Sequence, residues 1–350
     1  MHLSVIALSV PAKLASFLTR SKNSVAVAHV PAIRPWHSRA PWAFALALLL
    51  APTLALADGP LIVPGSFAVG STGAATYSVP IQVPPGTAGM VPALSLGYSS
   101  QGGNGLVGMG WSLGGLPSVS RCPQTIAQDG VTGTVNFTAN DRFCLDGQRL
   151  VAINGAYGAD GTEYRTEIDG FSRIVSHGTS GTGPTWFQVW TKSGQIMEFG
   201  NGFQILATGT PSVRVWAVTK ISDTAGNYLT VSHGQNATTG EVWPTEIDYT
   251  GNAVTGLVPY DAVKFSYATR SDVTTQYQTG VTVQQTQLLT NIRTYTGGAL
   301  VFDYRLAYQP GGGAAIRPFA ASSNGPTMSR GSGNTMVEFL SAAMTVSVSR

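Results

Sequence analysis

The feature that most constrains the fold is a series of short runs in which apolar and polar residues alternate, each followed by a turn dipeptide. Between residues 68 and 309 the sequence shows no amphipathic helical pattern of useful length. Alternation with a period of two predicts strands that bury one face. The best candidates are Arg173–Val175, Trp186–Trp190, Gln195–Phe199, Val213–Val218, Tyr228–Val231, Val263–Tyr267 and Leu300–Tyr304. The pattern predicts an all-β domain of many short antiparallel strands and hairpins.

Asn, Asp and Gly pairs separate these runs. Asn and Asp tolerate a left-handed backbone and Gly adopts it without penalty, so such pairs predict hairpin turns. They occur at Asp146-Gly147, Asn154-Gly155, Asp160-Gly161, Asp169-Gly170, Asn201-Gly202 and Gly251-Asn252. Two of the turn regions, Asp223–Tyr228 and Tyr249–Asn252, also form a weak internal repeat. Its spacing is too irregular to indicate a solenoid.

The charge distribution argues against a nucleic-acid partner. The 350 residues carry 20 basic and 17 acidic side chains, a formal net charge of +3. Five basic residues and no acidic ones lie in residues 1–57, so the remainder holds 15 basic against 17 acidic residues. A chain with a net charge of −2 has no electrostatic basis for binding nucleic acid. The 43% hydrophobic content is instead typical of a folded domain with a real core.

Residues 1–57 have the pattern of a targeting segment. Arg34 and Arg39 precede the apolar run 42–51, and Ala55-Leu56-Ala57 provides an A-x-A cleavage site. The run is short for a bilayer span, so we expect an export signal, with a lone transmembrane anchor as the alternative. The mature protein is therefore expected to be periplasmic or secreted, and to meet a membrane only through this signal. The long stretch before the run suggests a start codon assigned too far upstream.

Glycine dominates residues 102–114, where it stands at 102, 103, 105, 108, 110 and 114. So much glycine implies positive φ angles or close chain approach, and Trp111 is the one large side chain able to anchor such a turn. Gly103–Gly108 also satisfies the dinucleotide pattern G-x-G-x-x-G. That site requires a helix after the third glycine, and the following residues cannot form one. We therefore expect no bound nucleotide cofactor.

Gly110–Gly114 satisfies G-x-S-x-G, the nucleophile elbow of α/β-hydrolases, with Ser112 as the candidate nucleophile. The elbow needs a following helix and a later acid and histidine. The only later histidines, His177 and His233, do not follow an α/β pattern. No calcium-loop pattern occurs among the scattered aspartates, so no metal site is expected. We expect no catalytic, cofactor-binding or metal-binding residues, and hence no enzyme.

Two further groups of side chains have competing interpretations. Cys122 and Cys144 are the only cysteines, and in an exported chain we expect them to form a disulfide rather than a reactive thiol or metal site. The aromatic residues could fill a β core or form a carbohydrate-binding platform. They are Trp186, Phe187, Trp190, Trp216, Trp243 and Tyr249.

The stretch from Val79 to Leu113 reads V-P-I-x-V-P-P-G-T-x-G-x-x-P-x-L-x-L-x-Y-x-S-x-x-G-N-G-x-x-G-x-G-W-x-L. It resembles the opening of the SpvB-type N-terminal domain, found in the Salmonella virulence protein SpvB, in B components of insecticidal Tc toxins and in Rhs-repeat proteins. The similarity extends over roughly residues 60–308. Further matching segments are Phe143–Gly147, Tyr164–Glu167, Lys192–Gly200, Trp216–Tyr228 and Glu246–Asn252.

The resemblance implies that the chain is the opening part of an Rhs/Tc-B-like β shell that encloses a toxic C-terminal segment. Its implied partners are that downstream segment or other toxin-complex subunits, and family members may act after delivery into the host cytoplasm. The E-x-E pair of the family's ADP-ribosyltransferase domain is absent here. The alternative function is a stand-alone secreted adhesin or carbohydrate-binding protein.

The resemblance divides the chain into three parts: the signal at 1–57, an SpvB-like β domain at 58–309, and a tail at 310–350. The tail is rich in Gly and Ser and shows no clean strand pattern before Met344–Val348. It fits either a frameshift or truncation, or a low-complexity linker.

Overall fold

The computed structural model describes residues 65–308, 335–338 and 344–349. They belong to one compact unit, residues 58–350, and nearly all of its regular structure is strand. The prediction of an all-β fold with antiparallel pairing is confirmed. The helical segments described are two single turns, η1 (Thr87–Gly89) and α2 (Ile126–Asp129). The predicted signal, residues 1–57, lies outside the described residues.

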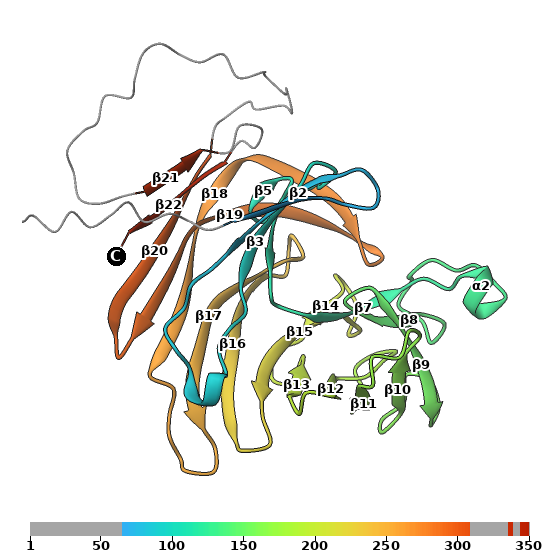
Figure 1. Cartoon of the computed structure of the whole chain (residues 1–350). Coiled ribbons are helices and arrows are strands. Elements are labelled where there is room, and N and C mark those ends of the chain that lie inside the picture. The colour runs from blue at the N-terminus through green and yellow to red at the C-terminus, as the bar shows by residue number, and fades with distance from the viewer. Residues whose placement is uncertain (1–64, 309–334, 339–343, 350) are drawn as a thin grey trace, which may run out of the picture. The chain divides into compact units, whose positions relative to one another are not determined.

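A small sheet begins the described chain (Figure 1). Its four antiparallel strands follow the order β1-β2-β3-β6. They are β1 (Ser66–Val69), β2 (Ala75–Pro80), β3 (Ser95–Ser99) and β6 (Trp111–Gly114). Between β3 and β6 the glycine-dense stretch forms a separate hairpin of β4 (Asn104–Gly105) and β5 (Gly108–Met109).

Eight strands of the large sheet form a closed ring, because β15 pairs with both β7 and β13. Large aromatic side chains fill its centre, and Phe143, Phe187 and Trp216 meet edge to face with ring centroids 5.1–5.4 Å apart. The strands are β7 (Ser118–Cys122), β8 (Arg142–Leu145), β9 (Gln148–Asn154), β10 (Glu163–Thr166), β11 (Arg173–His177), β12 (Trp186–Trp190), β13 (Ile196–Phe199) and β15 (Val213–Ser222).

The large sheet continues from β15 as an open, curved series of long strands (Figure 1). The order is β15-β16-β17-β18-β19-β20-β22-β21, and β14 pairs separately with β15. The strands are β14 (Ile205–Leu206), β16 (Asn227–Asn236), β17 (Glu241–Asn252), β18 (Asp261–Gln278), β19 (Val281–Thr296), β20 (Ala299–Tyr308), β21 (Thr335–Glu338) and β22 (Met344–Ser349). The pairing of β22 with β20 places Met344–Ser349 in the same sheet as the preceding domain.

The small sheet and the segment after β2 pack on the open part of the large sheet. Leu94 and Leu96 belong to one buried cluster with Ile247, Val263 and Ile292. Two tyrosine hydroxyls bind the backbone of the proline-punctuated segment 80–85. The amide of Gln82 donates to the Tyr304 hydroxyl at 2.8 Å, and the Tyr249 hydroxyl donates to the Pro84 carbonyl at 3.1 Å. This segment therefore crosses from β20 to β17 as a strap.

The seven predicted strands all occur as strands, most of them longer than the sequence pattern indicated.

One turn prediction is wrong. Gly251-Asn252 ends strand β17, and the chain turns after it. In the ladder Gly251 pairs with Tyr228 and Asn252 pairs with Asn227, so the two members of the weak repeat lie side by side. A Cβ at Gly251 would lie 2.5 Å from the Tyr228 ring, so this glycine serves close packing rather than a turn.

Candidate functional site: an apolar crevice around Leu116

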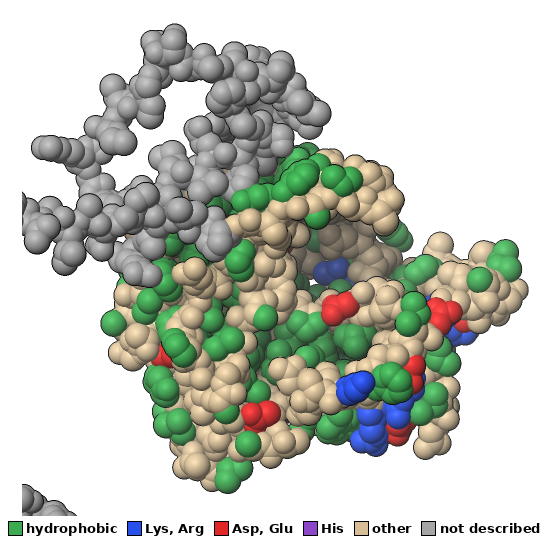
Figure 2. Space-filling view, viewed as in Figure 1, with side chains coloured by type: hydrophobic (Ala, Val, Ile, Leu, Met, Phe, Trp, Pro, Cys, Tyr) green, Lys and Arg blue, Asp and Glu red, His purple; other side chains and the backbone are tan. Residues whose placement is uncertain are grey.

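The end of β6 and the connection 115–117 join the small sheet to the ring, and three cavities open around them. Their volumes are about 250, 470 and 160 Å³. Leu116 lines all three, Leu113 lines the first two, and Met197 of β13 lines the last two. We call these three adjoining cavities the crevice. Figure 2 shows the described unit hollowed on one face, with hydrophobic side chains inside the hollow.

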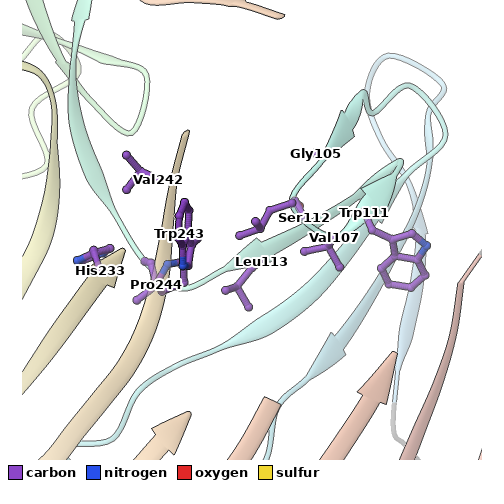
Figure 3. A pocket seen from close by; sticks show the side chains of 11 residues that line it. Gly105, Val107, Trp111, Ser112, Leu113, His233, Val242, Trp243 and Pro244 are labelled. Carbon is purple, nitrogen blue, oxygen red and sulfur yellow. The ribbon is translucent and has the colours of Figure 1, made fainter. Parts of the chain in front are cut away.

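The first cavity lies between the β4–β6 region and strands β16 and β17 (Figure 3). Val107, Leu113 and Leu116 line it from the small-sheet side, and Trp243 and Pro244 line it from β17. The Tyr267 hydroxyl donates to the Pro244 carbonyl at 2.6 Å, which ties the β17 wall to β18. This cavity is therefore lined mainly by apolar groups from distant parts of the chain.

Within the described part of the chain, His233 of β16 is the one ionisable residue that lines the first cavity. Its imidazole stacks on Phe203 with centroids 5.3 Å apart. Desolvation by burial lowers its pKa to about 4, although the backbone of Val231 acts in the opposite direction. His233 is therefore neutral at pH 7.

The other two cavities share this uncharged character. Met90, Leu229 and Ile247 line the smallest one, together with Met197 from the ring. Asp146 lines the middle cavity and is the only Asp, Glu, Lys or Arg among the described residues that line the three cavities. Its carboxylate already accepts a hydrogen bond from the Ser118 amide at 2.9 Å. The crevice thus offers almost no charge to a ligand.

Gly115 allows the connection to pass close to the segment that precedes β3. It has a φ of +97°, and a Cβ there would lie only 2.0 Å from the Ala93 carbonyl oxygen. Any other residue would both adopt a strained left-handed backbone and collide with that oxygen. The position of Leu116 in the crevice therefore depends on this glycine.

Arg270 of β18 holds the glycine-dense hairpin against the large sheet. Its guanidinium is buried and donates to the Gly105 carbonyl at 2.9 Å and to the Asn104 side chain at 2.5 Å. It also pairs with Asp272 at 3.0 Å. Hydrogen bonds from Arg270 and Asn104 lower the pKa of Asp272 to about 2. Arg270 could not be recognised from the sequence, because no local pattern links it to a hairpin 165 residues earlier.

The structural residues named from the sequence take well-defined places. Trp111 is buried on β6, with its ring 5.4 Å from that of Tyr98. Cys122 and Cys144 are joined by a disulfide between β7 and β8. Beside it, Arg121 and Asp141 form a fully buried ion pair that sequence reasoning did not detect.

Ser112 lies on strand β6, not on a turn before a helix, and its hydroxyl donates to the Gly97 carbonyl at 3.4 Å. Ser112 and His233 line the same cavity, yet no Asp or Glu lines it with them. His177 lies apart on β11, stacked on Trp186 at 4.0 Å. The described residues therefore do not assemble a Ser-His-acid triad in this cavity.

The six aromatic residues considered as a carbohydrate platform are distributed between fully buried and partly buried positions. Phe187, Trp216 and Tyr249 are fully buried, so they cannot form an exposed platform with the other three. Within the described ranges there is no group of three or more His, Cys, Asp or Glu side chains placed to hold a metal ion. No helix there is both long and apolar enough to cross a membrane.

Comparison with known families identifies the first part of this architecture. Residues 69–242, from β1 to the start of β17, match the family model "SpvB: Salmonella virulence plasmid 65kDa B protein". This part of the chain is an SpvB-family domain. The resemblance stated from the sequence is confirmed. The search of curated proteins gave no significant match.

Solved structures share the fold of the SpvB domain and the strands that follow it. The N-terminal domain of effector protein SpvB from Salmonella typhimurium strain LT2 is 20% identical, with a TM-score of 0.53 over 66% of this chain and 93% of that chain. TcdB2-TccC3 without its hypervariable C-terminal region is 18% identical, with a TM-score of 0.59 over 71% of this chain. The Photorhabdus luminescens Tc holotoxin pore is 18% identical, with a TM-score of 0.56.

Similarity at these identities shows the fold alone. This chain covers about 15% of the length of the Tc toxin chains that it matches. The comparisons therefore show an SpvB-family domain at residues 69–242 and a fold shared with the SpvB N-terminal domain and with TcdB2-TccC3.

Proposed function

We propose that the chain is a structural carrier module, which contributes its curved sheet to the wall of a shell around a toxic polypeptide segment. The observation that carries this proposal is the curved, hollowed sheet with an apolar interior, in a fold shared with TcdB2-TccC3. Apolar walls of this kind suit a polypeptide that is kept from water and from folding. The implied partner is the polypeptide encoded downstream, or another subunit of a toxin complex.

The role needs no chemistry from the protein itself, and we propose that the domain is not an enzyme. Ester hydrolysis that is lost in Ser112→Ala would contradict this part of the proposal. We also propose export through residues 1–57. N-terminal sequencing of the mature protein tests this step, with cleavage after Ala57 as the expected result.

Protease protection tests the carrier role. The full chain is co-expressed with the polypeptide encoded downstream of it, and the purified complex is digested with a nonspecific protease. A wall-forming module slows digestion of the downstream polypeptide relative to that polypeptide alone. Digestion at the same rate, or failure of the two to co-purify, would contradict the proposal.

A further inference from the structure

The crevice around Leu116 has a form that distinguishes between classes of ligand. It consists of three adjoining cavities of about 160–470 Å³ arranged around one segment, rather than one large cavity. Pockets for whole small molecules typically hold roughly 300–1,000 Å³. The middle cavity, at about 470 Å³, lies within that range, whereas the other two, at about 250 and 160 Å³, are smaller and lie beside it around the same segment. Peptide-binding surfaces instead offer a separate pocket for each of several side chains along an extended chain. The arrangement around Leu116 is of the second kind.

The side chains that line the crevice discriminate between ligands by charge. Burying an unpaired charge against apolar walls carries a large desolvation cost, whereas apolar side chains gain free energy there. Of the described residues that line the crevice, Asp146 is the only Asp, Glu, Lys or Arg, and it is already hydrogen-bonded to Ser118. The matching ligand is therefore uncharged along the part that enters the crevice.

The walls also suit bulky side chains. Trp243, Met197 and Leu116 contribute one aromatic and two flexible aliphatic surfaces from three separate elements, and all three remain partly exposed. Methionine adapts to side chains of different shape, and aromatic rings provide a large contact area. Such walls can accept different apolar residues in turn without demanding one sequence.

We propose that the crevice binds an extended, uncharged polypeptide segment through its bulky apolar side chains, which enter the cavities around Leu116 one after another. This inference rests on the proposed carrier function and names the part of the wall that contacts the enclosed chain. The occupant is a segment of the enclosed polypeptide. A single small apolar molecule or a second copy of this chain are the other outcomes that the test separates.

Fluorescence anisotropy tests the proposal with the full chain. The probe is a fluorescein-labelled ten-residue peptide that alternates serine with phenylalanine and leucine. Its control carries glutamate at the apolar positions. The expected result is saturable binding of the apolar peptide, weakened about tenfold or more by the loss of apolar burial in Leu116→Lys or Met197→Lys. Ile168→Lys, at an exposed apolar site outside the crevice, is the matched control and leaves binding unchanged.

Photo-cross-linking keeps the test independent of whether the lysine variants fold. The same peptide with a benzophenone group is irradiated with the unmodified full chain, and the adducts are mapped by mass spectrometry. Adducts on residues that line the crevice support the proposal. Absence of saturable binding, adducts mainly elsewhere, or equal binding of the glutamate peptide would overturn it. Equal affinity for N-acetyl-phenylalanine amide would also overturn the proposal, since that result indicates a small-molecule pocket. Binding of the peptide probe only by self-associated copies of the chain would overturn it as well.

The outcome is distinguishable from failure of the carrier function. Protease protection without peptide binding means that the wall encloses its cargo without using the crevice. Peptide binding without protection means that the module binds apolar segments but does not enclose them.

Discussion

Arg121 and Asp141 form an ion pair inside the protein, with Nη1 and Oδ2 3.0 Å apart and both side chains almost fully buried. The pair joins three parts of the ring region. Arg121 Nε donates to the Val213 carbonyl of β15 at 2.7 Å. The Asp141 carboxylate accepts from the backbone amides of Asn136 and Phe137. One pair thus holds β7, β15 and the loop inside the disulfide together.

Asp141→Ala is expected to lower the free energy of unfolding by about 3–5 kcal/mol, because it leaves the buried Arg121 guanidinium without a countercharge. Denaturant unfolding of the full chain measures the change. Lys264→Met is the control, since the Lys264–Glu246 pair at 2.8 Å is partly exposed to solvent and contributes about 1 kcal/mol or less. Equal losses of unfolding free energy in the two variants would show that burial does not make the Arg121–Asp141 pair more important for stability than a partly exposed pair.

Gly115→Ala is expected to destabilise the fold by more than about 2 kcal/mol, because alanine adds both left-handed strain and a collision with the Ala93 carbonyl. Gly103→Ala is a close control: this exposed glycine has no atom within 4 Å of an added Cβ. Thermal unfolding compares the two variants. A melting temperature for Gly115→Ala equal to that of the control would contradict the close approach.

The disulfide is expected to contribute about 3 kcal/mol to the free energy of unfolding by restricting the unfolded chain between Cys122 and Cys144. Unfolding of the Cys122→Ser/Cys144→Ser variant, compared with the native chain under non-reducing conditions, measures this contribution. Adding a thiol reductant lowers the stability of the native chain and leaves the variant unchanged. If the reductant lowered the stability of both proteins by the same amount, its effect would not come from the Cys122–Cys144 disulfide.

His233 predicts a pH dependence whose sign follows from its lowered pKa. The folded protein holds this imidazole neutral down to about pH 4, whereas an unfolded chain protonates it near its ordinary value of 6.5. Over this window the unfolded state binds more protons, so stability falls as the pH is lowered from about 6.5 to about 4. His233→Phe removes this contribution and flattens the stability curve between those values. An unchanged slope in the variant would show that His233 is not desolvated.

The sequence predicted the strands well because alternation is a local property. Trp186–Trp190 was predicted and found with the same bounds, and Asp146-Gly147 forms the expected turn between β8 and β9. Both depend on residues within a few positions of one another. The wrong turn prediction at Gly251-Asn252 also comes from using local sequence alone. The residue pair does not distinguish a turn from close packing of Gly251 against Tyr228 on the neighbouring strand.

The ring and the crevice could not be predicted in this way. Ring closure depends on β13 pairing with β15, which local alternation leaves undetermined. The crevice brings Leu116 together with Met197 and Trp243, and no sequence pattern links these three residues to one another. Arg121 and Asp141 likewise gave no signal, since isolated charges in a β-rich chain are usually exposed. Family resemblance supplied the fold, but not these contacts.

The most direct measurement of the central claim is single-particle electron cryomicroscopy of the full chain in complex with the polypeptide encoded downstream. The account predicts density for that polypeptide on the hollowed apolar face of the sheet, next to Leu116 and Trp243. Density confined to the outer face, or particles in which the hollow contains only solvent, would contradict the carrier role.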